Sequence, residues 1–195
     1  MDKLIKALAF DDSVRVYIAN TTTIANTARK HHDLWPGALS VLGKTMSIAA
    51  MMGAMLKGDE LVTVKLLTNG PIGNIIVDAD AKGAVKGYVD HPHINFVHIE
   101  SNTLSDSFAI GENANIQVIK DLKLKDYFTS SIPMHSIDIA KDFTYYFTVS
   151  EQTPSAVGLG IHIEETNEAK ISGGFILQIM PNANDEVISF LEQNI

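Results

Sequence analysis

Three histidines in one short stretch are the residues best suited to metal chemistry. His91 and His93 are two positions apart, and His98 follows. Residues two apart point to the same side of an extended segment, and three histidines can form a catalytic zinc site. The carboxylates that could support such ligands are Asp90 and Glu100. Surface histidines in a proline-containing loop are the favoured interpretation of this pattern, so a zinc-dependent hydrolase is the alternative hypothesis and not the leading one.

Serine and glycine motifs give no complete catalytic or nucleotide-binding pattern. Residues 150–155 read SEQTPS, but neither G-x-S-x-G nor S-x-x-K is present, so this segment indicates a turn. Glycine pairs at residues 70–73 and 158–160 lack the helix start that a phosphate loop requires. We therefore expect no catalytic, cofactor-binding or metal-binding residues, and we predict that the protein is not an enzyme.

Composition narrows the functional classes further. The 195 residues include no cysteine, which excludes disulfides, thiolate zinc sites and cysteine nucleophiles within this chain. The formal net charge is −8, from 23 acidic and 15 basic residues, and no basic run could follow a phosphate backbone. The N-terminal sequence MDKLIKALAF lacks the apolar length of a signal peptide. We expect a cytoplasmic protein with neither nucleic acid nor a membrane as its partner.

The elements that must position these residues follow from hydrophobic periodicity. Alternation predicts an N-terminal hairpin, and Thr21, Thr22 and Thr23 offer capping oxygens for a helix that ends before Trp35. Two antiparallel meanders follow, separated by turn residues, and they could pack face to face. The predicted strands are residues 3–10 and 13–19 for the hairpin, 61–67, 73–79 and 84–89 for the first meander, and 142–150, 157–164 and 171–180 for the second.

Residues 35–60, WPGALSVLGKTMSIAAMMGAMLKGDE, predict one long helix that is apolar nearly all round. A bilayer span is disfavoured because Lys44 would cost about 2.5 to 3.5 kcal/mol near the membrane centre. We predict a helix in the core, while a flexible methionine surface that binds other proteins stays open as an alternative. At helical spacing the small residues Gly43, Ser47, Ala50 and Ala54 share one face, and Val41, Ile48, Met52 and Met55 share another.

The tail and the fold class complete the description. Residues 184–194 predict an amphipathic helix with an asparagine cap and no glycine or proline stop, which favours truncation at this point. Residues 94–125 are weakly patterned, with a strand or short helix near Ile116 and Val118. The predicted fold is α+β, with two packed, mainly antiparallel sheets, a long buried helix and flanking helices. We expect a core domain at 1–181, and a C-terminal helix at 182–195 that would begin a truncated linker.

Several motifs, taken together and in order, resemble the N-terminal domain of the 33 kDa heat-shock protein family. The resemblance spans nearly the whole chain. Its pieces are HDLWP from His32, GKTM from Gly43, MGAMLKGD at 52–59, GPIG at 70–73, DADAKGAVKGYV from Asp78, DFTYYF from Asp142, SEQTPS at 150–155 and GGFILQIMP from Gly173.

The chain also departs from this family. Family members carry a helical linker and a module whose four cysteines, in C-x-C and C-x-x-C pairs, hold zinc when reduced and form disulfides when oxidised. This chain has none of these cysteines, so we expect no cofactor in it. The segment 103–114 diverges as well: Ser107 and Phe108 stand where a basic pair is expected, and Ala114 replaces a glycine.

The resemblance implies an ATP-independent holdase chaperone, homodimeric, that binds unfolding proteins under oxidative and heat stress. Without cysteines the redox switch cannot operate in this chain. Residues 1–181 would then be the chaperone core, and the resemblance assigns no client-binding residues. The rival hypotheses are the zinc-dependent hydrolase at His91, His93 and His98, and a purely structural dimerisation domain.

Overall fold

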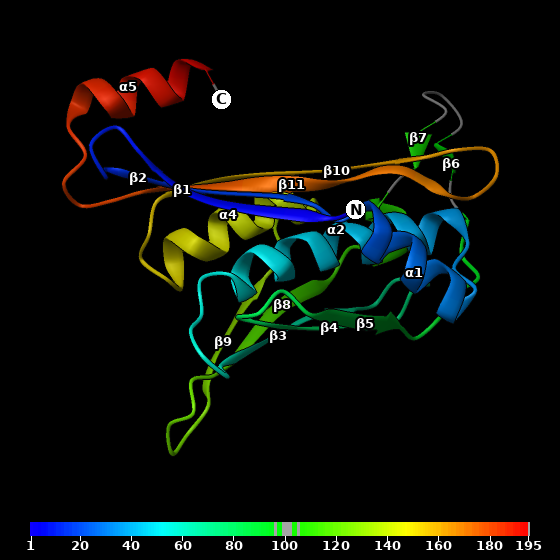
Figure 1. The fold of residues 1–195 in the computed structure, drawn as a ribbon. Helices are drawn as coiled ribbons and strands as arrows, with labels where there is room; N and C mark the ends of the chain where they lie inside the picture. Colours follow the sequence, from blue (N-terminus) through cyan, green and yellow to red (C-terminus); the bar gives the residue numbers. More distant parts are fainter. Residues whose placement is uncertain (96, 99–102, 105, 195) are drawn as a thin grey trace.

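The structure, a computed structural model, describes residues 1–95, 97–98, 103–104 and 106–194, with the backbone alone for 97–98 and 103–104. Groups of strands are separated by helices along the chain, as Figure 1 shows. In chain order the elements are β1 (Lys3–Ala9), β2 (Val14–Asn20), α1 (Thr22–His32), α2 (Pro36–Gly53), β3 (Leu61–Thr68), β4 (Ile75–Asp80), β5 (Val85–Val89), β6 (Val97–His98), β7 (Thr103–Leu104), α3 (Asp106–Ile110), β8 (Ala114–Asp121), β9 (Phe128–Pro133), α4 (Ile139–Val149), β10 (Ser155–Ile163), β11 (Ala169–Ile179) and α5 (Asp185–Asn194).

Two antiparallel sheets form the outer layers. The four-stranded sheet has the order β1-β2-β11-β10, so the N-terminal hairpin pairs with the C-terminal one through β2 and β11. The five-stranded sheet has the order β5-β4-β3-β8-β9. Helices α2 and α4 lie between the sheets, as Figure 1 shows, so the sheets sandwich a helical layer and do not pack directly on each other. This arrangement confirms the predicted α+β class.

Helix α2 is the centre of the core. Apart from Pro36 and Lys44, all its residues are buried, including the three methionines that lie within the helix. The helix begins at Pro36, whose fixed φ suits the first turn. Lys44 reaches Asp106 of α3, with 2.5 Å between Nζ and Oδ2. The predicted core helix is therefore present, and within the described residues no helix is both long enough and apolar enough to cross a membrane.

Helix α1 is capped from a distance, and not by its own threonines. The carboxylate of Asp2 accepts hydrogen bonds from the backbone N–H groups of Thr23 and Ile24, both at 2.7 Å. The Thr21 hydroxyl instead lies in the core, 2.6 Å from the Ser47 hydroxyl and 3.1 Å from that of Ser172. The predicted capping by these threonines was therefore wrong, because buried hydroxyls need partners of their own and find them on α2 and β11.

The prediction of a strand at residues 142–150 was also wrong, since this segment belongs to helix α4. Aromatic and β-branched residues favour a strand, but the aromatics recur at helical spacing, and Phe143, Tyr146 and Phe147 are all buried. Asp138 caps the helix by accepting a 3.0 Å bond from the Lys141 N–H. The buried Asp142 carboxylate stabilises the turn that leads into α4 by accepting three backbone N–H bonds, from His135, Ser136 and Asp138.

The remaining predicted elements are present with shifted ends. The weakly patterned segment contains β8, which includes Ile116 and Val118, and strand β9 follows where none was predicted. The predicted tail helix is α5, and the Asn184 side chain accepts a 2.9 Å bond from the Val187 N–H as its cap. Figure 1 shows α5 on the far side of the four-stranded sheet from α2.

Candidate functional site

The two sheets differ in what they present to the outside. On the five-stranded sheet the residues that face α2 are apolar and buried, and polar or charged residues occur on the outward face of every strand. This alternation is usual for an antiparallel sheet with one face in solvent. The outward polar residues include Thr63, Lys65, Asp78, Lys86, Gln117, Thr129 and Ser131.

The four-stranded sheet carries apolar residues on its outer face as well as on its inner face. Tyr17, Ala19 and Ile176 point toward α2 and are buried. Their neighbours along each strand point the other way, because side chains alternate across a sheet. Cross-strand partners share a face, so the registers identify this second set. We call it the open sheet face: Ile5, Ala7, Val16, Ile18, Phe175, Leu177, Ala156, Gly158 and Gly160.

Charge is excluded from the middle of the open sheet face. The polar residues on this side, Lys3, Asn20 and His162, lie toward one end of the sheet. Ile5 and Ile18 are direct cross-strand partners, and 55% and 45% of their surfaces are exposed. A contiguous apolar surface of this kind on a protein with a net charge of −8 indicates a surface that contacts other apolar groups.

Glycines shape the floor of the open sheet face. The Phe175 ring covers Gly158, where a Cβ would lie 2.3 Å from Phe175 Cε1. At Gly160 a Cβ would meet nothing within 4 Å. Glycine in a strand interior costs roughly 0.5 to 1 kcal/mol, so packing explains Gly158 but not Gly160. The missing side chain at Gly160 keeps the backbone accessible from the open side.

Helix α5 covers one end of this surface. The rings of Phe10 and Phe190 lie 5.6 Å apart, which joins the helix to the turn between β1 and β2. No residue of α5 is buried, although it carries several apolar side chains. Between Asn194 and the sheet lies a hollow of about 930 Å³, lined by Ile18, Phe175 and Leu177 among others. The open sheet face is thus only partly covered by the described chain.

The described side chains of the histidine stretch, those of His91 and His93, have separate surroundings. His93 Nε2 lies 2.9 Å from Asp33 Oδ2, and its ring lies 5.4 Å from that of Trp35. His91 is exposed in the same loop, and His98 lies in β6, where only its backbone is described. Among the described residues no group of three potential metal ligands occurs. His93 therefore holds the loop against the α1–α2 connection.

The serine and glycine motifs also have structural roles. The Ser155 hydroxyl donates to the Thr153 carbonyl at 2.9 Å, inside the turn that precedes β10. At Gly70 a Cβ would lie 2.2 Å from the carbonyl oxygen of Ala109, so only glycine allows these backbones to approach. Neither segment opens a helix, which agrees with the absence of a phosphate-loop pattern.

One polar network joins the five-stranded sheet to α4. Lys120 Nζ lies 2.5 Å from Glu151 Oε1, the Tyr146 hydroxyl donates to that same oxygen at 2.9 Å, and Ser130 lies 2.9 Å from the hydroxyl. Burial raises the pKa of Tyr146, and the Glu151 carboxylate raises it further, against the lowering effect of the Ser130 bond. All four groups satisfy one another, so the network indicates a structural tie and not a reactive site.

Comparison with known proteins settles the family. The sequence model of the Hsp33 protein family matches residues 2–195. The chain belongs to the Hsp33 family. The motifs that suggested this family in the sequence therefore identified it correctly.

Several relatives of known name share the whole of this chain. It is 50% identical over 194 residues to the 33 kDa chaperonin of Staphylococcus aureus strain Newman, and equally to that of strain COL, covering 100% of this chain and 66% of each relative. The crystal structure of the 33 kDa chaperonin from Thermotoga maritima superposes with a TM-score of 0.92 at 34% identity, covering 97% of this chain and 65% of that one. The chain thus spans about two thirds of the length of its Hsp33 relatives.

The residues present do not suit the zinc module that the resemblance implied. That module binds zinc through cysteines, and this chain has none. Of the three histidines in the alternative hypothesis, His93 is paired with Asp33, and the side chain of His98 lies outside the described part of the chain. The expected absence of a cofactor stays a prediction.

Proposed function

We propose that this Hsp33-family chain is the core of an ATP-independent holdase chaperone, which binds unfolding proteins through the open sheet face. The family and the names of its relatives support a chaperone role. The single observation that carries the site is the apolar outer face of the four-stranded sheet, beside an ordinary polar face on the other sheet. Unfolding proteins expose apolar side chains, which are complementary to such a surface.

The proposal needs no reactive group. Burying apolar side chains stabilises a complex by roughly 25 cal/mol per Å², and the strand register presents those side chains without directional bonds. Binding is then tolerant of client sequence, as a holdase requires. The negative net charge keeps the complexes soluble. A homodimer in the cytoplasm, bound to unfolded or partly unfolded clients, completes the proposal.

The test removes apolar surface from the open sheet face without touching the core. Ile5→Asn combined with Ile18→Asn replaces one exposed cross-strand pair. We expect several-fold weaker suppression of aggregation of a chemically unfolded client at equimolar ratio. The matched control is Leu124→Asn with Tyr127→Asn, which changes two residues 71% and 69% exposed at the β8–β9 hairpin. Equal loss in both double variants would contradict the assignment to the sheet.

The alternatives predict other outcomes of the same assay. If the chain is a purely structural dimerisation domain, adding the unaltered chain should leave the aggregation of the client unchanged. Because the chain has no cysteine, peroxide should cause no thiol-dependent gain of activity, and a gain that dithiothreitol reverses would contradict this expectation. The hydrolase hypothesis requires that protein purified without added metal contains stoichiometric zinc. It also requires that His93→Ala removes this zinc.

A further inference from the structure

Strand β5 forms one edge of the five-stranded sheet and has backbone groups that no other strand uses. Its register with β4 is fixed at both ends: the Asp80 N–H donates to the Ala84 carbonyl at 3.1 Å, and the Asp90 N–H donates to the Asn74 carbonyl at 3.0 Å. Hydrogen-bonded pairs alternate along an antiparallel ladder. Lys86 and Tyr88 therefore bond to β4, and the N–H and C=O groups of Val85 and Gly87 point away from it.

A hollow beside helix α1 borders this strand. The hollow has a volume of about 510 Å³, within the range of ligand sites, and both Val85 and Gly87 line it. Its apolar wall includes Ile24 and Ala28 of α1 and Met46 of α2. Within the described part of the chain, the backbone of Val85 and Gly87 makes no backbone hydrogen bond to an element other than β4. Unpaired donors and acceptors beside apolar walls suit an added strand.

The charge around this hollow favours an acidic partner. The last turn of α1 carries Arg29, Lys30, His31 and His32, and both histidines line the hollow together with Lys86. The carboxylate in the lining, Asp78, is already engaged, since it accepts a 2.6 Å bond from the Thr63 hydroxyl and lies 3.7 Å from Lys86 Nζ. Arg29 is paired with Glu168 at 2.8 Å, so a carboxylate on the incoming strand would find its nearest basic groups in Lys86 and in Lys30 at the end of α1.

We propose that β5 accepts an extended peptide segment that adds to the edge of the five-stranded sheet, placing an apolar side chain in the hollow and acidic side chains beside Lys86 and α1. The peptide amide and carbonyl groups pair with Val85 and Gly87, and the hollow selects the side chain. This site lies on the other sheet from the open sheet face and uses directional bonds, so the two can be tested separately.

Amide hydrogen exchange followed by NMR tests this proposal on the whole chain. The probe is a short acetylated peptide of alternating glutamate and leucine. We expect the amides of Val85 and Gly87 to exchange at least roughly tenfold more slowly with peptide, while Lys86 and Tyr88 are protected with or without it. Methylation of every second backbone nitrogen removes the N–H donors along one edge of the peptide. A peptide methylated on the edge that pairs with β5 should not bind. Unchanged exchange at Val85 and Gly87, or equal binding after methylation of either edge, would overturn the proposal.

One variant on α1 and one on α4 supply the matched comparison. Thr27→Trp fills the hollow from an exposed helix position and should weaken peptide binding roughly tenfold, whereas Thr148→Trp, at an exposed threonine of α4 outside the lining, should not. A peptide with lysine in place of glutamate should bind more weakly. Octanoate serves as a competitor: if it binds in the hollow and the peptide does not, the site belongs to a small anionic amphiphile and the peptide proposal is wrong.

Discussion

The hydroxyl of Tyr146 connects three elements through one buried contact set. It donates to Glu151 and contacts Ser130 of β9, while Glu151 also pairs with Lys120 of β8. The network holds α4 to the five-stranded sheet on the side away from α1. The contribution of the network to the free energy of unfolding can be measured, because replacing Tyr146 by phenylalanine removes only the hydroxyl oxygen and keeps the shape of the ring.

Tyr146→Phe should lower the free energy of unfolding by about 1 to 3 kcal/mol at neutral pH, because the Glu151 and Ser130 bonds are lost. Denaturant titration measures this. Tyr127→Phe, at a residue 69% exposed on the β8–β9 hairpin, controls for removal of a phenol and should leave the midpoint unchanged.

The same variant should alter the response to alkali. Burial raises the pKa of Tyr146 in the folded state, while an unfolded tyrosine ionises near about pH 10. The folded state therefore keeps a proton that the unfolded state loses, so stability present below about pH 10 declines as the pH rises above it. Tyr146→Phe should decline less steeply across this range. An equal slope for both proteins, in urea midpoints taken from neutral to alkaline pH, would contradict the assignment.

Single residues show where sequence patterns stop being informative. Asp2 caps a helix that begins twenty residues later, and His93 pairs with Asp33 across 60 positions of sequence. A capping motif is local, so Thr21 to Thr23 were the natural candidates, but long-range partners are fixed only by the fold. The loop histidines could be identified as a group from the sequence, whereas the pairing of His93 with Asp33 could not.

At the scale of elements, close packing of α2 depends on glycines that tolerate substitution differently. At Gly43 a Cβ would lie 2.8 Å from the end of the flexible Ile161 side chain, which can move. At Gly53 it would lie 2.7 Å from the backbone carbonyl oxygen of Asp80, which cannot move without shifting β4. An alanine at Gly43 would therefore require only a side chain to move, whereas an alanine at Gly53 would require the backbone of β4 to move.

Gly53→Ala should destabilise the protein by about 1 to 3 kcal/mol despite the better helix propensity of alanine. Gly43→Ala should change stability by less than about 1 kcal/mol, because propensity and adjustment of Ile161 oppose each other. Thermal unfolding of the two variants side by side gives the comparison. A larger loss at Gly43 than at Gly53 would show that the backbone of β4 yields more easily than its contacts indicate.

Periodicity predicted most elements but not all their roles. The alternation of Val14, Val16 and Ile18 against Arg15 and Tyr17 identified β2, yet Tyr17 is the buried residue and Ile18 is 45% exposed. An alternating pattern shows that a strand has two faces, and only the partner layer decides which face is covered. The open sheet face was thus present in the sequence as apolar residues but could not be recognised as a surface. In α4, the spacing of Phe143, Tyr146 and Phe147 indicates a helix, whereas the strand propensity of the same segment favours a strand.

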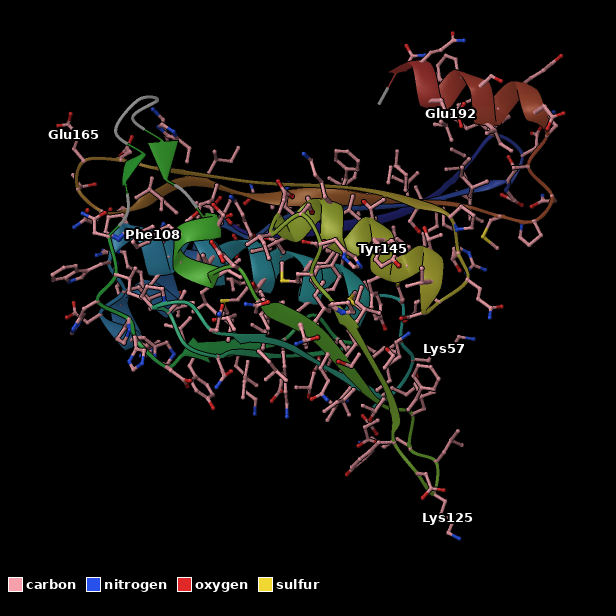
Figure 2. The ribbon with its side chains drawn as sticks, turned by 180° about the vertical axis from the view of Figure 1, so that it is seen from behind. Lys57, Phe108, Lys125, Tyr145, Glu165 and Glu192 are labelled. Carbon is pink, nitrogen blue, oxygen red and sulfur yellow. The ribbon has the colours of Figure 1, made fainter. Side chains whose placement is uncertain are left out.

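At the scale of the molecule, α5 lies on the outside of the four-stranded sheet. None of its residues is buried, and its ring contact with Phe10 is to a turn. The predicted division into 1–181 and 182–195 can therefore be tested by removal of the helix. Figure 2, seen from behind, shows α5 with Glu192 standing apart from the layers of the core.

A chain that ends at Ala183 should keep a thermal midpoint within a few degrees of the full chain, since few apolar contacts are lost. Its open sheet face should gain exposed apolar area, so binding of the dye ANS should rise. A strongly lowered midpoint would show that α5 belongs to the folding unit. The Ile5→Asn, Ile18→Asn double variant in the shortened chain should reverse part of the dye binding, which links the gain to this sheet.

The pairing of β2 with β11 has a consequence for the order of folding. Residues 14–20 pair with residues 173–179, so the four-stranded sheet cannot close until the chain has been synthesised as far as residue 179. Until then the N-terminal hairpin is a nascent segment with apolar side chains on both faces and an unpaired edge. The protein that we propose to bind unfolding clients should therefore itself be prone to aggregation during its own synthesis.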